Sequence, residues 1–309
     1  MNDRLERAAA ILRRHAGERV KRDLPLAPLT TFRIGGPASI YLEPDSGSDL
    51  EACGEAVGET GIPYLVIGKG SNILVADEGF PGLVLRLGRG FRWSARDGDI
   101  LTAGGSMPLP ALAGIALRHG LAGLEFGVAI PATLGGAVAM NAGAHSGEMS
   151  HVVETVTVFL MDTGNTTTLQ PADLGFSYRH SGVPKDGVVI GAALRLGPGD
   201  TAGIRLRMDA AKDWRRRTQP LAEPNCGSVF TNPAGDHAAR LIDAAGGKGL
   251  SVGGAAVSRK HANFIVANPG ATAADVRALI GRVQALVEAS SGVRLQTEVR
   301  FAGGAKDAV

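Results

Sequence analysis

The sequence predicts an α+β protein built of three domains. Stretches with strand-like composition alternate with stretches that repeat apolar residues at helical spacing, and 309 residues are enough for two or three domains. Glycine is abundant, with 44 residues, and the 32 Lys and Arg nearly balance the 30 Asp and Glu. The glycines predict many sharp turns and close backbone approaches. The balanced charge does not favour nucleic acid as a partner.

The first domain is predicted over residues 1–88. It begins with a helix at about 3–15, whose apolar residues Leu5, Ala8, Ala9 and Leu12 share one face. The elements after this helix predict a small βαβ unit. They are a strand at 39–42, a helix capped near Ser48 or Asp49, and strands at 63–67 and 83–87.

The second domain is predicted over residues 89–217. Its expected elements are strands at 100–103, 153–160, 166–169 and 188–196 and helices at 109–119 and 201–217. Asp162-Thr163-Gly164 has the composition of a hairpin turn. The apolar stretch 121–144 is interrupted by Pro131 and several glycines, so we expect a buried loop-and-turn region there rather than a membrane span.

The third domain is predicted over residues 218–309. It contains a strand-like segment at 228–231, a short helix at 238–245 and a long helix at 272–290 with a core-facing apolar stripe. A last strand is expected at 293–301. An alternative is that this strand returns to the first domain.

Several familiar chemistries are excluded by absent motifs. The chain has no GxGxxG or GxxxxGK[ST] loop, no HExxH and no CxxC, so neither a common nucleotide fold nor a metal site is expected. Its two cysteines and the lack of a signal-peptide core indicate a cytoplasmic protein. Cys226 is interpreted as a bystander thiol. Lys212 and residues 215–217 are either phosphate ligands or, as we favour, a solvated helix face.

Two glycine-rich stretches are candidates for ligand binding. Residues 68–72 (GKGSN) follow an apolar strand, where consecutive backbone N–H groups form either an anion-binding nest or a plain tight turn. Residues 129–144 are almost wholly small and apolar. This composition suits either a wall against a flat polycyclic ligand or a tightly packed corner of the core.

These stretches belong to a series of motifs that resembles the UDP-N-acetylenolpyruvoylglucosamine reductase family. In order, the motifs are LTTFRIGGPA (29–38), GKGSN (68–72), IPATLGGAVAMNAGA (130–144), YRHS (178–181), GSVFTNP (227–233), HANFIV (261–266) and LQTEV (295–299). The resemblance covers about residues 24–303. The chain departs from it at Ala129 and Ala132, where the family commonly has glycine.

The resemblance implies a fold and a reaction. The fold would be a two-subdomain FAD-binding module of the vanillyl-alcohol-oxidase-like type, followed by a C-terminal α+β domain for the UDP-sugar. The reaction would be the NADPH-consuming reduction of UDP-N-acetylglucosamine enolpyruvate to UDP-N-acetylmuramate, in peptidoglycan precursor synthesis. The enzyme would be a cytoplasmic monomer without a nucleic-acid or membrane partner.

The resemblance also implies roles for individual residues. Ser228 matches the proton donor, Arg179 the arginine that binds or stabilises the substrate carboxylate, and Glu298 the remaining active-site acid. We expect Glu298 to be protonated or to act through Arg179 or water, the alternative being a structural ion pair of these two residues. Substrate contacts fall on Tyr178 and Asn232. Cofactor contacts fall on Gly68, Lys69, Gly70, Ser71, Asn72, Pro131, Thr133, Gly135, Gly136, Asn141, Gly143 and Ala144.

Two other functions remain compatible with the sequence. One is a different flavoenzyme on the same scaffold, such as an oxidase that uses oxygen. The other is a nucleotide-binding protein without catalysis. The GSVFTNP and LQTEV motifs argue against the first, and the joint presence of Ser228, Arg179 and Glu298 argues against the second.

Overall fold

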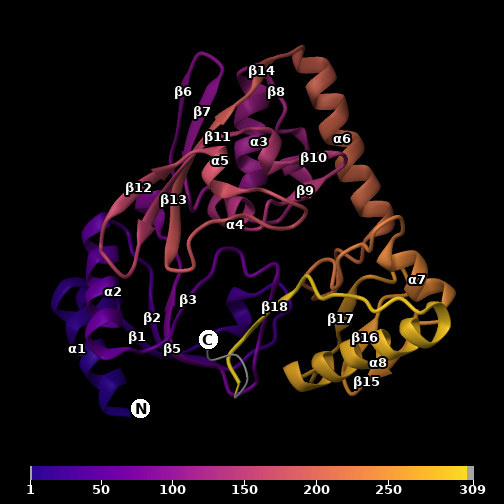
Figure 1. Ribbon diagram of the computed structural model, residues 1–309, viewed down its shortest axis with the longest axis horizontal. Coiled ribbons are helices and arrows are strands. Elements are labelled where there is room, and N and C mark those ends of the chain that lie inside the picture. Colours follow the sequence, from indigo (N-terminus) through magenta and orange to yellow (C-terminus); the bar gives the residue numbers. More distant parts are fainter. Residues whose placement is uncertain (1, 305–309) are drawn as a thin grey trace. The chain divides into compact units, whose positions relative to one another are not determined.

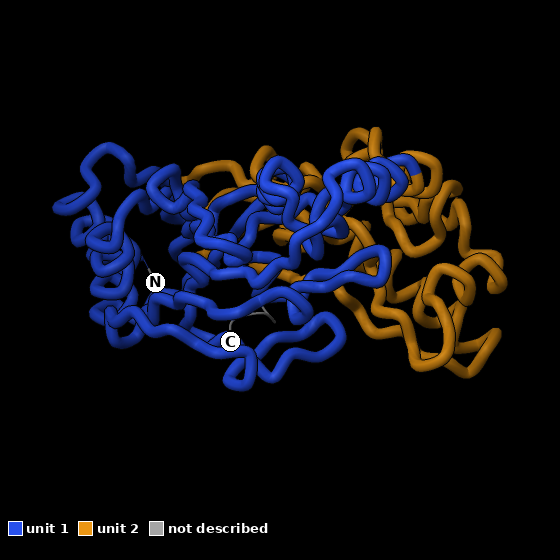
Figure 2. Tube along the Cα trace, turned by 90° about the horizontal axis from the view of Figure 1, so that it is seen from above, with its two compact units in different colours: residues 1–22, 39–69, 82–213 blue, residues 23–38, 70–81, 214–309 orange. Residues whose placement is uncertain are grey.

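The computed structural model describes residues 2–304, which fall into two compact units (Figure 2). Unit 1 comprises the described residues up to 22 together with 39–69 and 82–213, and unit 2 comprises 23–38, 70–81 and the described residues from 214 onward. Each unit has apolar clusters of its own.

Two helices cover one cluster of unit 1. They are α1 (Asn2–Ala16) and α2 (Gly47–Thr60), which lie side by side and are joined at the surface by the Arg7–Glu59 ion pair of 2.7 Å (Figure 1). The cap of α2 was predicted near Ser48 or Asp49 and lies two residues before Ser48. Ser46 is the N-cap, because its hydroxyl accepts the N–H of Asp49 at 3.2 Å.

A four-stranded sheet accompanies these helices. Its order is β1-β2-β5-β3, and β3 and β5 are parallel. Its strands are β1 (Lys21–Pro25), β2 (Pro37–Leu42), β5 (Phe80–Leu85) and β3 (Tyr64–Val66), of which residues 23–25, 37–38 and 80–81 are assigned to unit 2.

The second cluster of unit 1 lies on an antiparallel five-stranded sheet of order β12-β11-β13-β7-β6. Within residues 153–160, Val156 and Val158 belong to this second cluster, whereas Phe159 belongs to the cluster under α1 and α2. The two clusters share this strand because successive side chains point to opposite faces of a sheet. The strands are β6 (Ser94–Asp97), β7 (Ile100–Gly104), β11 (Val153–Leu160), β12 (Thr166–Leu169) and β13 (Gly187–Arg195). The hairpin predicted between β11 and β12 is present.

The helices of unit 1 on this second cluster include α3 (Leu109–Arg118) and α6 (Thr201–Thr218), of which residues up to 213 belong to the unit. The stretch 121–144 was expected to be loops and turns, and that expectation is incomplete. It holds β8 (Leu121–Ala122), the 3-10 helix η4 (Glu125–Ala129) and the short helix α4 (Leu134–Ala139), which begins after its cap, Thr133. Within residues 2–304, no helix combines the length and apolar character needed to cross a membrane.

Small elements complete unit 1. They are α5 (Pro171–Leu174), the hairpin of β9 (Gly143–Ala144) and β10 (Gly147–Glu148), and β14 (Gly197–Pro198), which pairs with β8.

Unit 2 has one apolar cluster between helices and a small sheet. Helix α8 (Ala273–Ser291), drawn in yellow in Figure 1, contacts β15 and β16 of the sheet β15-β16-β17. The other elements of unit 2 are α7 (Ala238–Ala244), β15 (Ser251–Val252), β16 (Ala255–Val257), β17 (Ile265–Ala267), β4 (Ile73–Val75) and β18 (Arg300–Ala302).

The predicted last strand at 293–301 is mostly wrong. Only Arg300–Ala302 forms regular strand, pairing in parallel with β4. Among the residues before it, Thr297 makes an isolated bridge to Phe230, and the segment 228–231 likewise forms isolated bridges in place of a ladder. Helix α8 lies within a residue of its predicted range, since Thr272 and Asp275 form a capping box at its start.

Candidate active site

Unit 2 places Ser228 and Glu298 on adjacent backbone segments. The N–H of Glu298 donates to the carbonyl of Val229 at 2.8 Å, and Val229 directly follows Ser228. On its other side, Ser228 bridges to Phe264. Both Ser228 and Glu298 are half-buried. The two candidate catalytic residues are therefore neighbours in the same unit, although 70 positions of sequence separate them.

The segment that carries Ser228 is held by Asn263. This side chain is 4% exposed, and its amide bonds both backbone groups of Phe230, accepting from the N–H at 2.9 Å and donating to the carbonyl at 2.8 Å. The N–H of Val229 donates to the carbonyl of Asn263 at 2.9 Å. Sequence reasoning treated 261–266 only as a packed strand. The signal it missed was a single amide within the apolar run ANFIV, which needs a buried partner.

The segment that carries Glu298 is held by Asn72. The side-chain amide of Asn72 donates to the carbonyl of Glu298 at 3.1 Å, and the N–H of Arg300 donates to the carbonyl of Asn72 at 3.1 Å. Asn72 belongs to the GKGSN motif, which was expected to bind cofactor. One of its functions in unit 2 is thus to fix the backbone of a candidate catalytic acid.

The GKGSN loop has backbone donors available for an anion. No acceptor within residues 2–304 bonds the backbone N–H groups of 68–72. Gly70 has a φ of +61°, and an added Cβ would collide with the carbonyl of Leu29. An added Cβ on Gly68 would lie 2.5 Å from Oγ1 of Thr133. Lys69 is exposed and Ser71 half-buried. Consecutive donors of this kind fit the phosphates of a dinucleotide cofactor.

The backbone N–H groups at the start of α4, unlike those of residues 68–72, are bonded within the protein. Thr133 Oγ1 accepts the N–H of Gly136 at 3.3 Å, and the N–H of Gly135 donates to the carbonyl of Gly105 at 2.9 Å. Gly136 is exposed, and only Oγ1 of Thr133 would lie within 4 Å of an added Cβ. Pro131 is also exposed. The exposed residues at this end of α4 are therefore small, Gly136 and the compact ring of Pro131, which suits a flat ligand.

Arg179 lies in a tight turn of unit 1. The N–H and carbonyl groups of Ser177 and His180 bond each other at 3.1 and 3.0 Å around it. Arg179 is half-buried, and its guanidinium donates from Nη2 to the carbonyl of Gly143 at 3.0 Å and lies 4.8 Å from the centre of the Tyr178 ring. Tyr178 is 51% exposed. Both candidate substrate-binding side chains of this motif thus lie close together.

Asn141 was also expected to bind cofactor, but its side chain is fully buried. Its Nδ2 donates to the carbonyl of Ser177 at 2.9 Å and to Oε1 of Glu148 at 3.1 Å, and its Oδ1 accepts the N–H of Ser150 at 2.9 Å. Both N–H donors of the amide are therefore engaged within unit 1. Gly143 and Ala144, further along the same motif, form strand β9 and are half-buried.

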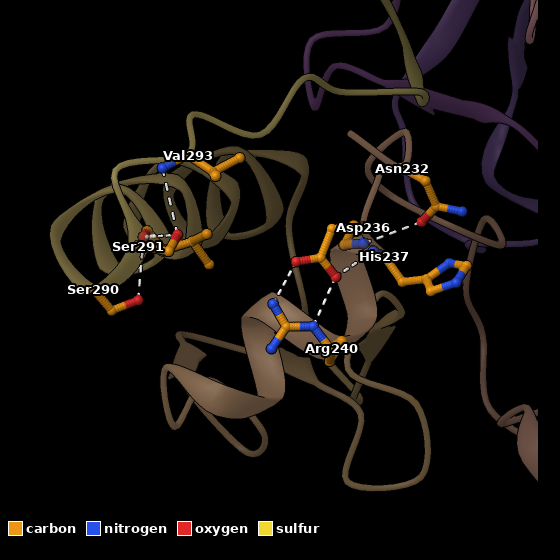
Figure 3. A network of polar contacts seen from close by, with 9 residues as sticks. Asn232, Asp236, His237, Arg240, Ser290, Ser291 and Val293 are labelled. Carbon is orange, nitrogen blue, oxygen red and sulfur yellow. Dashed lines mark hydrogen bonds and ion pairs between the residues drawn. The ribbon is translucent and has the colours of Figure 1, made fainter. Parts of the chain in front are cut away.

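Asn232 is exposed and bonds the start of a short helix whose N-cap is His237. Its Oδ1 accepts the N–H of Ala238, the first residue of α7, at 3.0 Å (Figure 3). Nearby, Asp236 pairs with Arg240, as Figure 3 also shows. The oxygen of the Asn232 amide therefore has a structural function, and its Nδ2 is the group left to contact a substrate.

Cys226 and the basic cluster have no evident chemical function. Burial raises the pKa of the Cys226 thiol, which keeps it protonated. Lys212 pairs with Asp209 at 3.1 Å, and Arg215 donates to Gln219 at 2.8 Å. Within residues 2–304, no His, Cys, Asp and Glu side chains group so as to hold a metal ion.

Comparison with known proteins identifies two regions of the chain. Residues 38–170 match a family model described as FAD binding domain, and residues 219–302 match the C-terminal domain of UDP-N-acetylenolpyruvoylglucosamine reductase. The fold class is thus that of a flavin-binding oxidoreductase with an added C-terminal domain, and the expected α+β fold with an FAD-binding module is confirmed.

Curated relatives extend the match over nearly the whole chain. UDP-N-acetylenolpyruvoylglucosamine reductase of Heliobacterium modesticaldum is 47% identical, covering 90% of this chain and 89% of the relative. The enzyme of the same name from Anaeromyxobacter sp. strain Fw109-5 is 48% identical, covering 96% and 92%. The chain belongs to the UDP-N-acetylenolpyruvoylglucosamine reductase family.

A solved structure of the same family also matches this chain. The crystal structure of UDP-N-acetylenolpyruvylglucosamine reductase from Thermus caldophilus has a TM-score of 0.82 and 39% sequence identity, covering 92% of this chain and 99% of that one.

Proposed function

We propose that this protein reduces UDP-N-acetylglucosamine enolpyruvate to UDP-N-acetylmuramate, as a cytoplasmic enzyme of peptidoglycan precursor synthesis. The observation that carries the proposal is the adjacency of Ser228 and Glu298, through the 2.8 Å bond from the Glu298 N–H to the carbonyl of Val229, in a chain of this family. FAD, when bound, supplies the hydride that reduces the enolpyruvyl double bond, and NADPH is the source of that hydride.

We assign the cofactor to the glycine-rich stretches. The unengaged N–H groups of 68–72 would receive phosphate oxygens, with Lys69 and Ser71 as further donors. The surface with the exposed Pro131 and Gly136 would lie against the flavin ring, and the buried Thr133 and Gly135 would fix its backbone. Gly143 and Ala144 would continue this surface.

The remaining tasks fall to three side chains. Arg179 would bind the substrate carboxylate with its planar guanidinium and stabilise negative charge that develops next to it. Ser228 would donate a proton to the carbon that becomes carbanion-like, since a positioned hydroxyl suffices for so basic an acceptor. Glu298 would act protonated or through Arg179 or water, because an ionised carboxylate would oppose the developing charge. Tyr178 and Asn232 would contact the substrate.

The proposal is tested by following the two half-reactions of Ser228→Ala in a stopped-flow spectrophotometer. We expect the bleaching of the flavin by NADPH to remain within about twofold of wild type, and its reoxidation by the enolpyruvyl nucleotide to slow by about 10²–10⁴-fold, because only the second step needs the proton. Ser290→Ala, an exposed serine of α8, is the matched control. Equal losses in both half-reactions, or a protein that never takes up FAD, would refute the proposal.

A further inference from the structure

Arg179 has a backbone conformation that is unfavourable for a residue with a large side chain. Its φ is +58°, and it is the third residue of the turn closed by Ser177 and His180. Turns with a positive φ at this position normally place Gly or Asn there. A bulky side chain in this region persists only where the surroundings impose it. The contacts around the turn show which residues do so.

Two buried side chains hold the turn on either side of Arg179. Before it, the carbonyl of Ser177 accepts Nδ2 of Asn141 at 2.9 Å. After it, Oγ of Ser181 donates to the carbonyl of Ala139 at 3.0 Å. Asn141 is 0% exposed and Ser181 is 7% exposed, so both donor side chains are shielded from water. The turn is therefore fastened to residues 139–141 at both of its ends.

The same stretch of chain also orients the guanidinium. Nη2 of Arg179 donates to the carbonyl of Gly143 at 3.0 Å. An added Cβ on Gly143 would lie 3.2 Å from Nη1, so a larger residue there would crowd the guanidinium. Residues 139–143 thus set both the backbone of the turn and the direction of the charged group.

Asn141 is itself rigidly held. Its own φ is +41°, its Oδ1 accepts the N–H of Ser150, and its second donor reaches Oε1 of Glu148. Glu148 in turn accepts Oγ of Ser150 at 2.5 Å. Burial alone would raise the pKa of Glu148. Hydrogen bonds from Ser150 and Asn141, together with the charges of His151 and Arg179, have the larger effect, and the net pKa is lowered. An ionised Glu148 is the stronger acceptor for the Asn141 amide.

We propose that Asn141 and Ser181 are positioning residues for Arg179, and that the side chain of Asn141 serves this function rather than contact with the cofactor. The proposal rests on the proposed function for the role of Arg179 in binding substrate. It predicts that loss of either side chain impairs the step in which substrate is reduced and leaves the binding and reduction of FAD intact.

The test compares Asn141→Ala and Ser181→Ala with Asn165→Ala, an exposed asparagine of the same unit, as control. For Asn141→Ala we expect wild-type FAD content, unchanged flavin reduction by NADPH, and a KM for the enolpyruvyl nucleotide raised about tenfold. In an Arg179→Ala background the same substitution should change this KM by less than about twofold, since the residue that it positions is gone. Ser181→Thr, which keeps the hydroxyl, should restore most of the loss in Ser181→Ala.

Other outcomes would decide against the inference. Loss of FAD from Asn141→Ala, or effects that add fully to those of Arg179→Ala, would overturn it. If Asn141→Ala does not fold, Ser181→Ala and its threonine rescue decide the question. If Arg179→Ala leaves the KM unchanged, the role of Arg179 in the proposed function is wrong. The fastening of the turn is then tested by hydrogen exchange of residues 177–181, which should accelerate in Asn141→Ala; unchanged exchange would refute it.

Discussion

The side-chain amide of Asn72 donates to the backbone carbonyl of Glu298 at 3.1 Å, joining residues 226 positions apart. Asn72 belongs to a loop whose backbone donors we assign to the cofactor, and Glu298 is a candidate catalytic acid. One side chain of unit 2 therefore links a loop interpreted as a ligand-binding motif to the backbone that carries the acid.

Replacing Asn72 by alanine should destabilise unit 2 through this bond. We expect the free energy of unfolding to fall by about 1 kcal/mol, the net value of one partly buried hydrogen bond. Urea denaturation measures the change, and Asn268→Ala, an exposed asparagine whose amide bonds the carbonyl of Gly254, should cost less. Identical unfolding curves for Asn72→Ala and wild type would show that the bond contributes nothing.

The contact of Gly68 with Thr133 predicts a non-additive pair of substitutions. Gly68→Ala should destabilise unit 1 because its Cβ would lie 2.5 Å from Oγ1 of Thr133. Thr133→Ala should cost about 1 kcal/mol by removing the cap of α4. Gly68→Ala should cost less in the Thr133→Ala background than in wild type, as measured by thermal unfolding. Strict additivity would contradict the predicted collision.

Asp49 predicts a specific dependence of stability on pH. It is 5% exposed and receives two bonds from Arg19 at 2.8 and 2.7 Å. The Arg19 guanidinium lowers the pKa of Asp49 against the opposing effect of burial. A carboxyl with a lowered pKa in the folded state stabilises the fold above its unfolded pKa of about 4, and this stabilisation is lost as the pH falls through the folded pKa.

Asp49→Asn should therefore destabilise the protein by about 1.5–3 kcal/mol at pH 7, the range for hydrogen bonds to charged groups. The difference from wild type should shrink as the pH is lowered below about 4. Urea unfolding of both proteins across this range measures it. A difference that stays constant down to the lowest pH at which both fold would show that the carboxylate charge is not involved.

Both cysteines should be unreactive in the native protein. Burial raises the pKa of Cys53 to about 12 and also raises the pKa of Cys226, so the thiolate is scarce at pH 8. Reaction with Ellman's reagent should be negligible until denaturant is added, when both thiols should react. Rapid labelling of the native Cys53→Ser variant would identify Cys226 as accessible and overturn its assignment as a bystander.

Local sequence predicted the regular elements well. Helix α8 and strands β11 and β12 lie at or within a residue of their predicted ranges, because apolar periodicity, caps and turn residues act over a few positions. The irregular segments were predicted less well. Residues 228–231 and 293–299 depend on bonds to each other and to Asn263, which no local pattern reveals.

The sequence by itself determined the family, through motifs whose order and residue types are specific, and with it the candidate residues Ser228, Arg179 and Glu298. Only the tertiary structure decided that Asn72 and Asn263 hold the backbone of the site in unit 2 and that Asn141 bonds the turn of Arg179 in unit 1. The physical reason is that a buried amide must find its hydrogen-bond partners somewhere in the fold, and those partners are remote in sequence.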